Sequence, residues 1–159
     1  MTDQAKIETD FWDALDSDRT VMLSRGGQGA APPRPMTAIV EEKPGPIWFF
    51  TARDSELLDG MRDGDAALFT FADKGNTVFA TVSGALIETD DRVVIDRLWN
   101  PFIAAWYNGK DDPKLALLRF DPKEAEIWDS GNSLVAGLKI LLSSDPAESM
   151  SGRVAHARD

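Results

Sequence analysis

The chain has 159 residues, 43% of them hydrophobic and 28% charged, which is enough for one globular core and too little for two separate domains. Its 27 acidic and 17 basic residues give a formal net charge of −10, which argues against duplex nucleic acid or an anionic membrane surface as the main partner, because both need a concentrated positive field. The absence of cysteine excludes disulfides, thiolate chemistry and cysteine-ligated metal centres.

The N-terminal segment predicts a helix and shows no targeting signal. Ile7, Phe11 and Leu15 recur at helical spacing, which indicates one amphipathic helix over roughly the first 16 residues. The segment lacks the basic start and the apolar stretch of a signal peptide, and no run of 18 apolar residues follows, so we expect a cytoplasmic location. The apolar stretch Thr20–Leu23 then predicts a short strand.

A hairpin and a short helix are predicted next, after a loop rich in glycine and proline. Met36–Glu42 and Ile47–Ala52 are interpreted as two strands joined by the turn Lys43–Pro46. Because Ile47–Ala52 is a continuous apolar run, we expect this strand to be buried on both faces. A polar residue then caps a short helix that is predicted over Ser55–Arg62.

Two longer strands follow, Ala66–Ala72 and Thr77–Ile87, with the turn Lys74–Asn76 between them. The second is the longest strand that the sequence predicts, and its alternation separates an apolar face from a mixed face. The apolar face consists of Val78, Ala80, Val82 and Leu86, and the mixed face of Thr77, Phe79, Thr81, Ser83 and Ile87.

Short helices are predicted in the region that follows. One begins at residue 90 or 91 and runs to residue 98, where Asn100-Pro101 ends it because the residue before a proline avoids the helical conformation. A second short helix carries Phe102 and Trp106 at a spacing of four residues. The segment Asn108–Pro113 is interpreted as a loop.

The C-terminal part predicts two short strands and a helix. Leu115–Phe120 and Ala125–Asp129 are the strands, and Asp121-Pro122 is the turn that joins them. The helical spacing of the leucines over residues 134–142 predicts a last amphipathic helix.

The six or seven strands come in closely connected pairs, which predicts an α+β fold that is mainly β, an antiparallel barrel or strongly curved sheet with peripheral helices. We expect residues 1–150 to form a single domain and residues 151–159 a flexible tail. The only histidine, His156, lies in that tail, which argues against a Ser-His-Asp arrangement or a histidine-rich metal site. Acidic pairs such as Asp111-Asp112 lack the spacing of a calcium loop, so no metal site is expected. Redox chemistry would then come from a bound cofactor.

Among the five tryptophans, Trp128 gives the clearest functional indication. Alternation places it on the polar face of its strand with Glu124 and Glu126, opposite Ala125 and Ile127. A large apolar side chain there needs a cover from outside its own sheet, for which a partner subunit, a cofactor or another loop would serve. Packing under the last helix is the alternative interpretation.

Five segments carry a family pattern through their order and spacing. They are Arg34-Pro35-Met36, Ile47–Thr51 with Ser55 after it, Val82–Ala85, Leu98–Pro113 and Glu126–Asp129. Together, from about Phe11 to Leu142, they resemble the pyridoxamine 5′-phosphate oxidase-like split-barrel flavoproteins, in particular the branch called general stress proteins. The stretch from Trp-Asn-Pro to Asp-Asp-Pro within residues 99–113 is the part most typical of that branch.

The resemblance implies a six-stranded antiparallel split β-barrel with peripheral helices, assembled as a homodimer with two flavin mononucleotide (FMN) sites at its interface. In that family two strands line the flavin, groups after the second strand hold the phosphate, and a tryptophan approaches from the other subunit. The cofactor-binding residues that it implies here are Arg34, Pro35, Met36, Phe49, Phe50, Thr51, Ser55, Ser83 and, across the interface, Trp106 or Trp128. No catalytic side chain is implied.

The phosphate site departs from the family pattern. Glu56 and Leu57 stand where oxidase-type members carry basic residues, and each charge-assisted hydrogen bond that is lost costs about 1.5–3 kcal/mol. Arg34 and Arg53 could compensate. The sequence therefore leaves open a weakly bound FMN, a different flavin or an empty site. Gly131–Leu134 likewise replaces the Arg-and-His segment of true pyridoxamine phosphate oxidases, so vitamin B6 oxidation is not expected.

Three functions are therefore considered. The leading hypothesis is a homodimeric flavin-dependent oxidoreductase of the stress-protein type, with an unknown substrate. The second is a non-catalytic protein that sequesters a flavin or another planar ligand. The third is a structural dimer whose flavin site has decayed.

Overall fold

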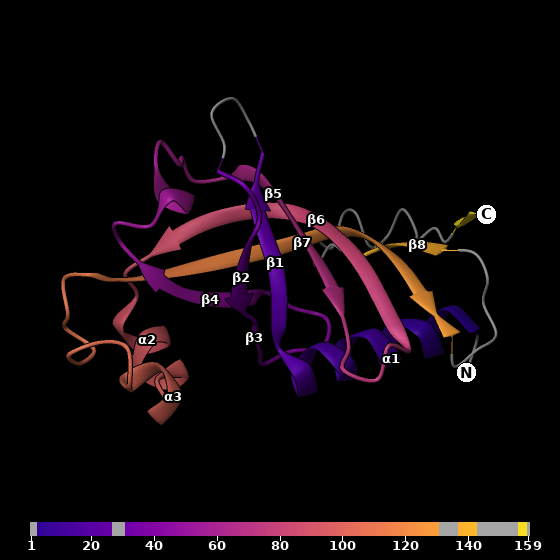
Figure 1. The fold of residues 1–159 in the computed structure, drawn as a ribbon, viewed down its shortest axis with the longest axis horizontal. Helices are drawn as coiled ribbons and strands as arrows, with labels where there is room; N and C mark the ends of the chain where they lie inside the picture. The colour runs from indigo at the N-terminus through magenta and orange to yellow at the C-terminus, as the bar shows by residue number, and fades with distance from the viewer. Residues whose placement is uncertain (1–2, 27–30, 131–136, 143–155, 159) are drawn as a thin grey trace.

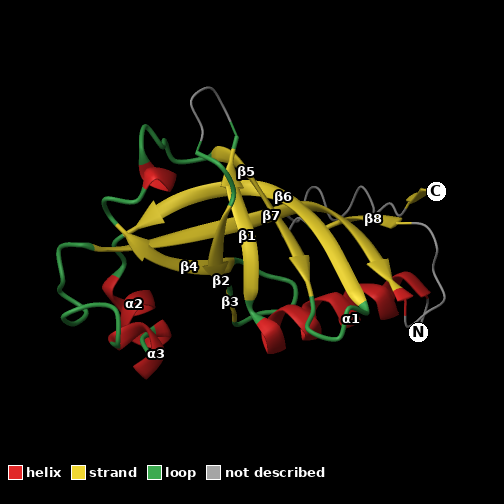
Figure 2. Ribbon diagram, viewed as in Figure 1, coloured by secondary structure: helices red, strands yellow, loops and turns green. Residues whose placement is uncertain are grey.

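The computed structural model describes residues 3–26, 31–130, 137–142 and 156–158, which form one curled antiparallel sheet with helices at its margins (Figure 1; Figure 2). The elements are α1 (Asp3–Asp18), β1 (Thr20–Arg25), β2 (Arg34–Thr37), β3 (Ile39–Val40), β4 (Ile47–Ala52), η1 (Glu56–Leu58), β5 (Asp65–Ala72), β6 (Val78–Thr89), α2 (Arg92–Leu98), α3 (Pro101–Ala104), β7 (Leu115–Asp129), β8 (Gly137–Leu141) and β9 (His156–Arg158).

The strand order explains why the sheet curls into a half-barrel. The main path runs β2-β1-β5-β6-β7-β4-β3, and every pairing in it is antiparallel. Its two outermost strands, β2 and β3, are consecutive in sequence and are separated by Ala38 alone. The two edges of the sheet must therefore lie close together, which confirms the expected α+β split-barrel fold.

The strand count differs from the expected six. The described part of the chain contains nine strands, because the strand predicted over Met36–Glu42 divides into β2 and β3 and the C-terminal part adds β8 and β9.

The first helix covers one opening of the half-barrel. As the spacing predicts, α1 buries one stripe of side chains, and Ile7, Phe11 and Leu15 are fully buried in the main core. Phe11 meets Phe71 of β5 edge to face, with ring centroids 6.5 Å apart. Trp12 packs against Phe11 in the same cluster, at 5.2 Å, so this tryptophan serves the core.

The strand β4 is buried on both faces, as its continuous apolar run predicts. Phe49 points into the main core, where its ring packs edge to face on Phe120 at 6.4 Å. Trp48 points the other way, into a second cluster with Ile95 and Leu98 of α2. Successive side chains of β4 therefore serve two separate cores, and Phe50 is left at the margin of the second one.

The two short strands predicted over 115–129 are wrong, because this segment forms the single strand β7. The predicted turn at Asp121-Pro122 lies within it. The register with β6 changes from Ser83↔Glu124 to Gly84↔Pro122, which leaves Lys123 without a partner in register. A bulge of this kind tolerates the proline and bends the strand without ending it.

The amphipathic helix predicted over 134–142 is also wrong for the part that the structure describes. Residues 137–142 include β8, which pairs with the second half of β7. The first half of β7 pairs with β4 on that edge, so its second half offers an edge that β8 covers. Ile140 and Leu142 are fully buried in the main core. Residues 131–136 lie outside the described residues.

Two predicted helices are shorter in the structure. The helix expected over Ser55–Arg62 is a three-residue 3-10 turn, η1, so its dipole is much weaker than the prediction supposed. The helix that should carry Phe102 and Trp106 ends at Ala104, and Trp106 lies just beyond α3. The helix before it, α2, begins after the Asp91 N-cap, as predicted.

The C-terminal segment 151–159 is described only in part. His156–Arg158 forms β9, which pairs with β8. The flexible tail and the single domain over 1–150 stay predictions.

The turn between β5 and β6 is held by one carboxylate, Asp73. Its Oδ1 accepts hydrogen bonds from the backbone N–H groups of Thr77 at 2.7 Å and Val78 at 3.0 Å, and its Oδ2 accepts one from the Thr77 hydroxyl at 2.6 Å. Burial opposes the charged form, but these hydrogen bonds outweigh it and hold the pKa of Asp73 below its usual 3.8.

We expect Asp73→Ala to lower the free energy of unfolding by about 1–2 kcal/mol at pH 7, because three donors lose an acceptor. Since the folded-state pKa is the lower one, this contribution is complete above pH 3.8 and disappears as the pH falls through the folded-state value. Urea unfolding at pH 7 and at lower pH checks both points, with the exposed Asp90→Ala as control. A difference between wild type and Asp73→Ala that persists unchanged in acid would contradict the assignment.

Candidate functional site

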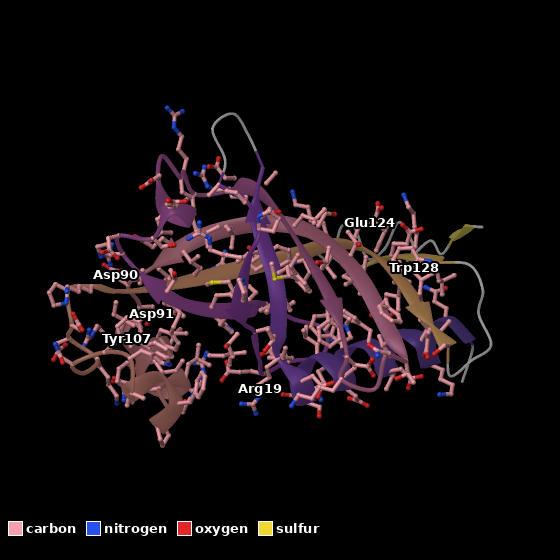
Figure 3. The ribbon with its side chains drawn as sticks, in the orientation of Figure 1. Arg19, Asp90, Asp91, Tyr107, Glu124 and Trp128 are labelled. Carbon is pink, nitrogen blue, oxygen red and sulfur yellow. The ribbon has the colours of Figure 1, made fainter. Side chains whose placement is uncertain are left out.

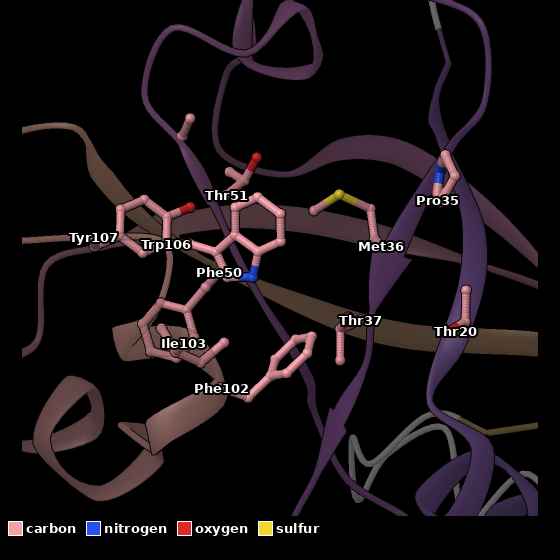
Figure 4. A pocket seen from close by; sticks show the side chains of 11 residues that line it. Thr20, Pro35, Met36, Thr37, Phe50, Thr51, Phe102, Ile103, Trp106 and Tyr107 are labelled. Carbon is pink, nitrogen blue, oxygen red and sulfur yellow. The ribbon is translucent and has the colours of Figure 1, made fainter.

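A cavity of about 390 Å³ opens between β2, β4 and the segment that follows α3 (Figure 4). Its lining residues are Thr20, Pro35, Met36, Thr37, Phe50, Thr51, Ala52, Phe102, Ile103, Trp106 and Tyr107. Five of these eleven residues are ones that the family resemblance predicted to bind the cofactor: Pro35, Met36, Phe50, Thr51 and Trp106.

The curl of the sheet brings the two sides of this cavity together. Met36 pairs with Val21 of β1, whereas Thr51 pairs with Ala116 of β7, so these residues belong to strands that are far apart in the sheet order. They become neighbours only because β2 and β3 join the two edges. Among the described strands β2 pairs only with β1, which leaves the backbone groups of its other edge available for a ligand.

Aromatic side chains form one wall of the cavity. Figure 4 shows Trp106 and Tyr107 on one side of it and Pro35 and Met36 on the other, with Phe102 at its lower margin. Trp106 is 73% exposed and Phe102 is 61% exposed, which is unusual for such large apolar residues on a protein that has a well-packed core. Flat, exposed rings at the mouth of a cavity suit a flat ligand or a second protein surface.

Tyr107 is the titratable side chain of this wall. Its burial, and to a smaller extent the carboxylates of Asp112 and Asp54, raise the pKa of its phenol above the usual value. The phenol therefore stays protonated at neutral pH. Tyr107 can donate a hydrogen bond into the cavity, and it does not serve as a base there.

A polar cluster formed by Arg34, Ser55 and Glu56 lies where β2 begins and η1 begins, directly next to the cavity residue Pro35. Arg34 Nη1 donates to Ser55 Oγ at 2.8 Å, and Arg34 Nη2 lies 3.4 Å from Glu56 Oε2. Ser55 Oγ also accepts from the N–H of Leu57 at 3.2 Å, as the cap of η1. Arg34 Nε is buried and has no hydrogen-bond partner among the described residues.

Arg25 binds the backbone of the turn that follows Ser55. Its side chain, which is mostly buried, donates from Nε to the carbonyl of Leu57 at 3.0 Å and from Nη2 to the carbonyl of Asp59. Its Nη1 pairs with Asp65 at 3.3 Å. Two hydrogen bonds from Arg25 therefore hold the backbone of the turn that carries Ser55 and Glu56.

Two of the predicted cofactor-binding residues, Phe49 and Ser83, lie away from this cavity, and so does Arg53, which could have compensated for the missing phosphate charges. Phe49 is buried in the main core, so only its backbone faces the neighbouring strands. Ser83 donates from its hydroxyl to the carbonyl of Glu124 at 3.4 Å, on the outer face of the sheet. Arg53, considered for the phosphate, instead pairs with Glu88 at 3.3 Å.

Trp128 belongs to a second cavity, of about 450 Å³, which lies over the outer face of β1, β5, β6 and β7. Alternation places it correctly, because Ala125 and Ile127 are fully buried on the opposite face. Figure 3 shows Trp128 and Tyr107 at opposite ends of the molecule. The two cavities share the lining residue Thr20, but Trp128 lines only the second one.

The outer sheet face around Trp128 is partly apolar. Met22 of β1, Leu68 of β5 and Phe79 of β6 are each about 40% exposed there, and Phe79 lies directly opposite Trp128 in the β6–β7 register. Three large apolar side chains on adjacent strands form a surface that a second protein copy could cover.

The sequence missed six of the lining residues, namely Thr20, Thr37, Ala52, Phe102, Ile103 and Tyr107. Thr37 and Ala52 directly follow designated residues, so extending each motif by one residue would have found them. The aromatic residues carried a signal in the spacing of Phe102 and Trp106.

The described ranges contain no candidate metal site and no helix that could cross a membrane. No group of three or more histidine, cysteine, aspartate or glutamate side chains there is arranged to hold a metal ion. None of the helices there has the length and apolarity needed to cross a membrane.

The chain matches one protein family and resembles several known proteins. A sequence model of the family described as "Pyridoxamine 5′-phosphate oxidase like" matches residues 6–146. A general stress family protein from Xanthomonas campestris pv. campestris is 51% identical, and the structures agree with a TM-score of 0.76 over 89% of this chain and 99% of that one. The general stress FMN/FAD binding protein from Xanthomonas citri is 48% identical, with a TM-score of 0.75 over 86% of this chain and 98% of that one.

A more distant similarity is confined to part of the sequence. General stress protein 26 of Bacillus subtilis strain 168 is 24% identical over 62 residues, which are 39% of this chain and 44% of the Bacillus protein. This chain therefore spans less than half the length of that relative.

Proposed function

The chain belongs to the pyridoxamine 5′-phosphate oxidase-like family, and from this premise we propose that it binds FMN between two copies of itself and acts as a flavin-dependent oxidoreductase. The observation that carries the proposal is the cavity of about 390 Å³ with the Arg34–Ser55 pair at the start of its β2 wall. The Xanthomonas citri relative, a general stress FMN/FAD binding protein, supports a flavin as the ligand.

The residues present fit a flavin. The cavity volume lies in the usual range for small-molecule sites, and its walls combine apolar side chains with the hydroxyls of Thr37 and Thr51. Pro35, Met36 and Phe50 would contact the ring system. Arg34 and Ser55 would hold the phosphate, and the buried, unpartnered Nε of Arg34 is a donor that a bound anion could satisfy.

The two tryptophans receive different roles in this proposal. Trp106 lines the cavity of its own chain, so it would cover the ring from within the subunit. Trp128 lies in the second cavity, far from Tyr107 (Figure 3), and could reach a flavin only in a partner subunit. Packing of the outer faces, through Met22, Leu68 and Phe79, would bury their exposed apolar area in the same step.

When bound, the flavin supplies the electron and hydride transfer. The chain supplies position and surroundings: apolar walls that exclude water, a cationic anchor at Arg34, and the protonated phenol of Tyr107 as a hydrogen-bond donor. No other cavity-lining side chain in the described ranges is titratable. Acid–base chemistry on a substrate would therefore rest on Tyr107, the flavin or solvent.

We expect purified protein titrated with FMN to quench the flavin fluorescence with a saturating curve, and to keep a visible flavin spectrum after gel filtration. Light scattering should give twice the 17.4 kDa mass of one chain. A protein that neither quenches FMN nor retains it would refute the proposed ligand. A monomeric mass at saturating FMN would refute the interface site.

A second candidate function is non-catalytic flavin sequestration, which the scarcity of titratable groups in the cavity favours. The two functions differ in turnover. An oxidoreductase consumes NADH or NADPH faster than the same concentration of free FMN does, whereas a sequestering protein binds FMN and leaves that rate unchanged or lower.

A further inference from the structure

We propose that Glu56 lowers the preference of this site for a phosphorylated flavin, so that the chain accepts riboflavin almost as well as FMN. The inference rests on the proposed flavin binding and adds to it the ligand class of the site: flavins with or without a terminal phosphate. It concerns the polar cluster of Arg34, Ser55 and Glu56, and not the cavity that would hold the ring.

Two of the three nitrogens of the Arg34 guanidinium, Nη1 and Nη2, already have partners within the chain, and Nε alone has none among the described residues. The Glu56 carboxylate lies 3.4 Å from Arg34 Nη2. Arg34 Nη1 donates to Ser55 Oγ at 2.8 Å, and that oxygen accepts a second hydrogen bond from the N–H of Leu57. A phosphate that takes the place of these contacts must displace an existing anion from the guanidinium.

Charge makes this competition unfavourable for a phosphate. A phosphate monoester carries about −1.5 to −2 charges at pH 7, and it would share Arg34 with the carboxylate of Glu56. Two other arginines near this turn are already engaged. Arg53 is engaged by Glu88 and by the carbonyls of Pro113 and Leu115. Arg25 is engaged by Asp65 and by the carbonyls of Leu57 and Asp59. Arg34 is thus the arginine that remains for a phosphate among the described residues of this cluster, and it already pairs with Glu56.

The size of the effect is limited by solvent. The Glu56 side chain is 72% exposed, so water screens its field and lets it turn away from a bound phosphate. We therefore expect a penalty of about tenfold in affinity, which equals about 1.4 kcal/mol. Riboflavin lacks the phosphate and escapes this penalty, because Glu56 does not line the ring cavity.

A structural role for Glu56 would have the opposite signature. If its carboxylate mainly held Arg34 in position for the phosphate, removing it would weaken FMN binding. If it shaped the turn η1 as a whole, both flavins would respond alike. The comparison of two flavins on one variant separates these possibilities.

The test is fluorescence titration of wild type and Glu56→Gln with FMN and with riboflavin, at about 0.05 M and about 1 M salt. We expect the substitution to raise FMN affinity about tenfold, to leave riboflavin affinity within about twofold, and to have less effect at high salt. Asp10→Asn is the matched control: it makes the same change in net charge, on α1, where Asp10 pairs with Lys6. It should shift neither affinity.

FMN affinity that is unchanged or reduced in Glu56→Gln would overturn the inference, and so would an equal gain for riboflavin. Binding of neither flavin to either protein would refute the proposed function itself, and the inference with it. The two failures are distinguishable, because the first leaves flavin binding intact.

Discussion

Arg34→Met should weaken FMN binding by about 10–100-fold and leave riboflavin binding nearly unchanged. Arg34 donates to Ser55 and pairs with Glu56 at the start of β2, and in the proposed complex it supplies the charged donors for the phosphate. A hydrogen bond to a charged group is worth about 1.5–3 kcal/mol, and each 1.4 kcal/mol is about tenfold in affinity. Methionine keeps an apolar stem of similar length, so the change removes mainly the guanidinium.

The measurement is again a fluorescence titration with both flavins. Arg92→Met is the matched control, because it removes an arginine from an exposed ion pair with Asp111, on α2. Arg34→Lys gives a finer test: it keeps the charge but loses the planar fork, so its FMN affinity should fall between wild type and Arg34→Met. Equal loss for FMN and riboflavin would show that Arg34 shapes the cavity and does not bind the phosphate.

Gly84→Ala should produce a large loss of stability, toward the upper end of the about 1–3 kcal/mol typical of an overpacked core. Gly84 lies at the bulge where the β6–β7 register shifts. A Cβ there would meet the backbone carbonyl oxygen of Asp121 and would lie 2.8 and 2.9 Å from two atoms of the Phe120 ring. Phe120 is fully buried against Phe49 and Phe69, so it has no room to move.

Urea unfolding checks this prediction, and Gly75→Ala is the control. A Cβ at Gly75 would have its nearest neighbours 3.8 and 3.9 Å away, so this substitution should leave the unfolding midpoint close to that of wild type or slightly higher. Equal midpoints for Gly84→Ala and wild type would mean that β6 and β7 do not approach as closely as described.

The elements that the sequence predicted correctly are those whose signal is local and strong. The helix α1 follows from one apolar stripe, and the faces of β6 follow from strict alternation, in which Val78, Ala80 and Val82 are buried as expected. The predictions were wrong where one sequence pattern is compatible with two kinds of secondary structure. The leucines of 137–142 fit a helix or a strand, and the free edge of β7 decided for the strand. Pro122 resembled a turn, but the bulge at the adjacent Lys123 kept β7 continuous.

The sequence predicted several residues of the site but not how they lie relative to one another. The motif residues Pro35, Met36, Phe50 and Thr51 do line one cavity, and their family resemblance identified them without any knowledge of their distance in space. The same resemblance could not separate Trp106 from Trp128. The structure places the first in the cavity of its own chain and the second in another cavity.

By itself, the amino-acid sequence determined the helix α1, the buried strand β4, the alternation of β6 and the absence of thiol chemistry, because each depends on residues that are near one another in the chain. Only the tertiary structure decided that Met36 and Thr51 face one cavity and that Glu56 pairs with Arg34. Strand order and the closure of β2 toward β4 result from long-range packing around one core, which minimises exposed apolar area over the whole sheet. Residues that are close together in the sequence do not determine this total exposed area.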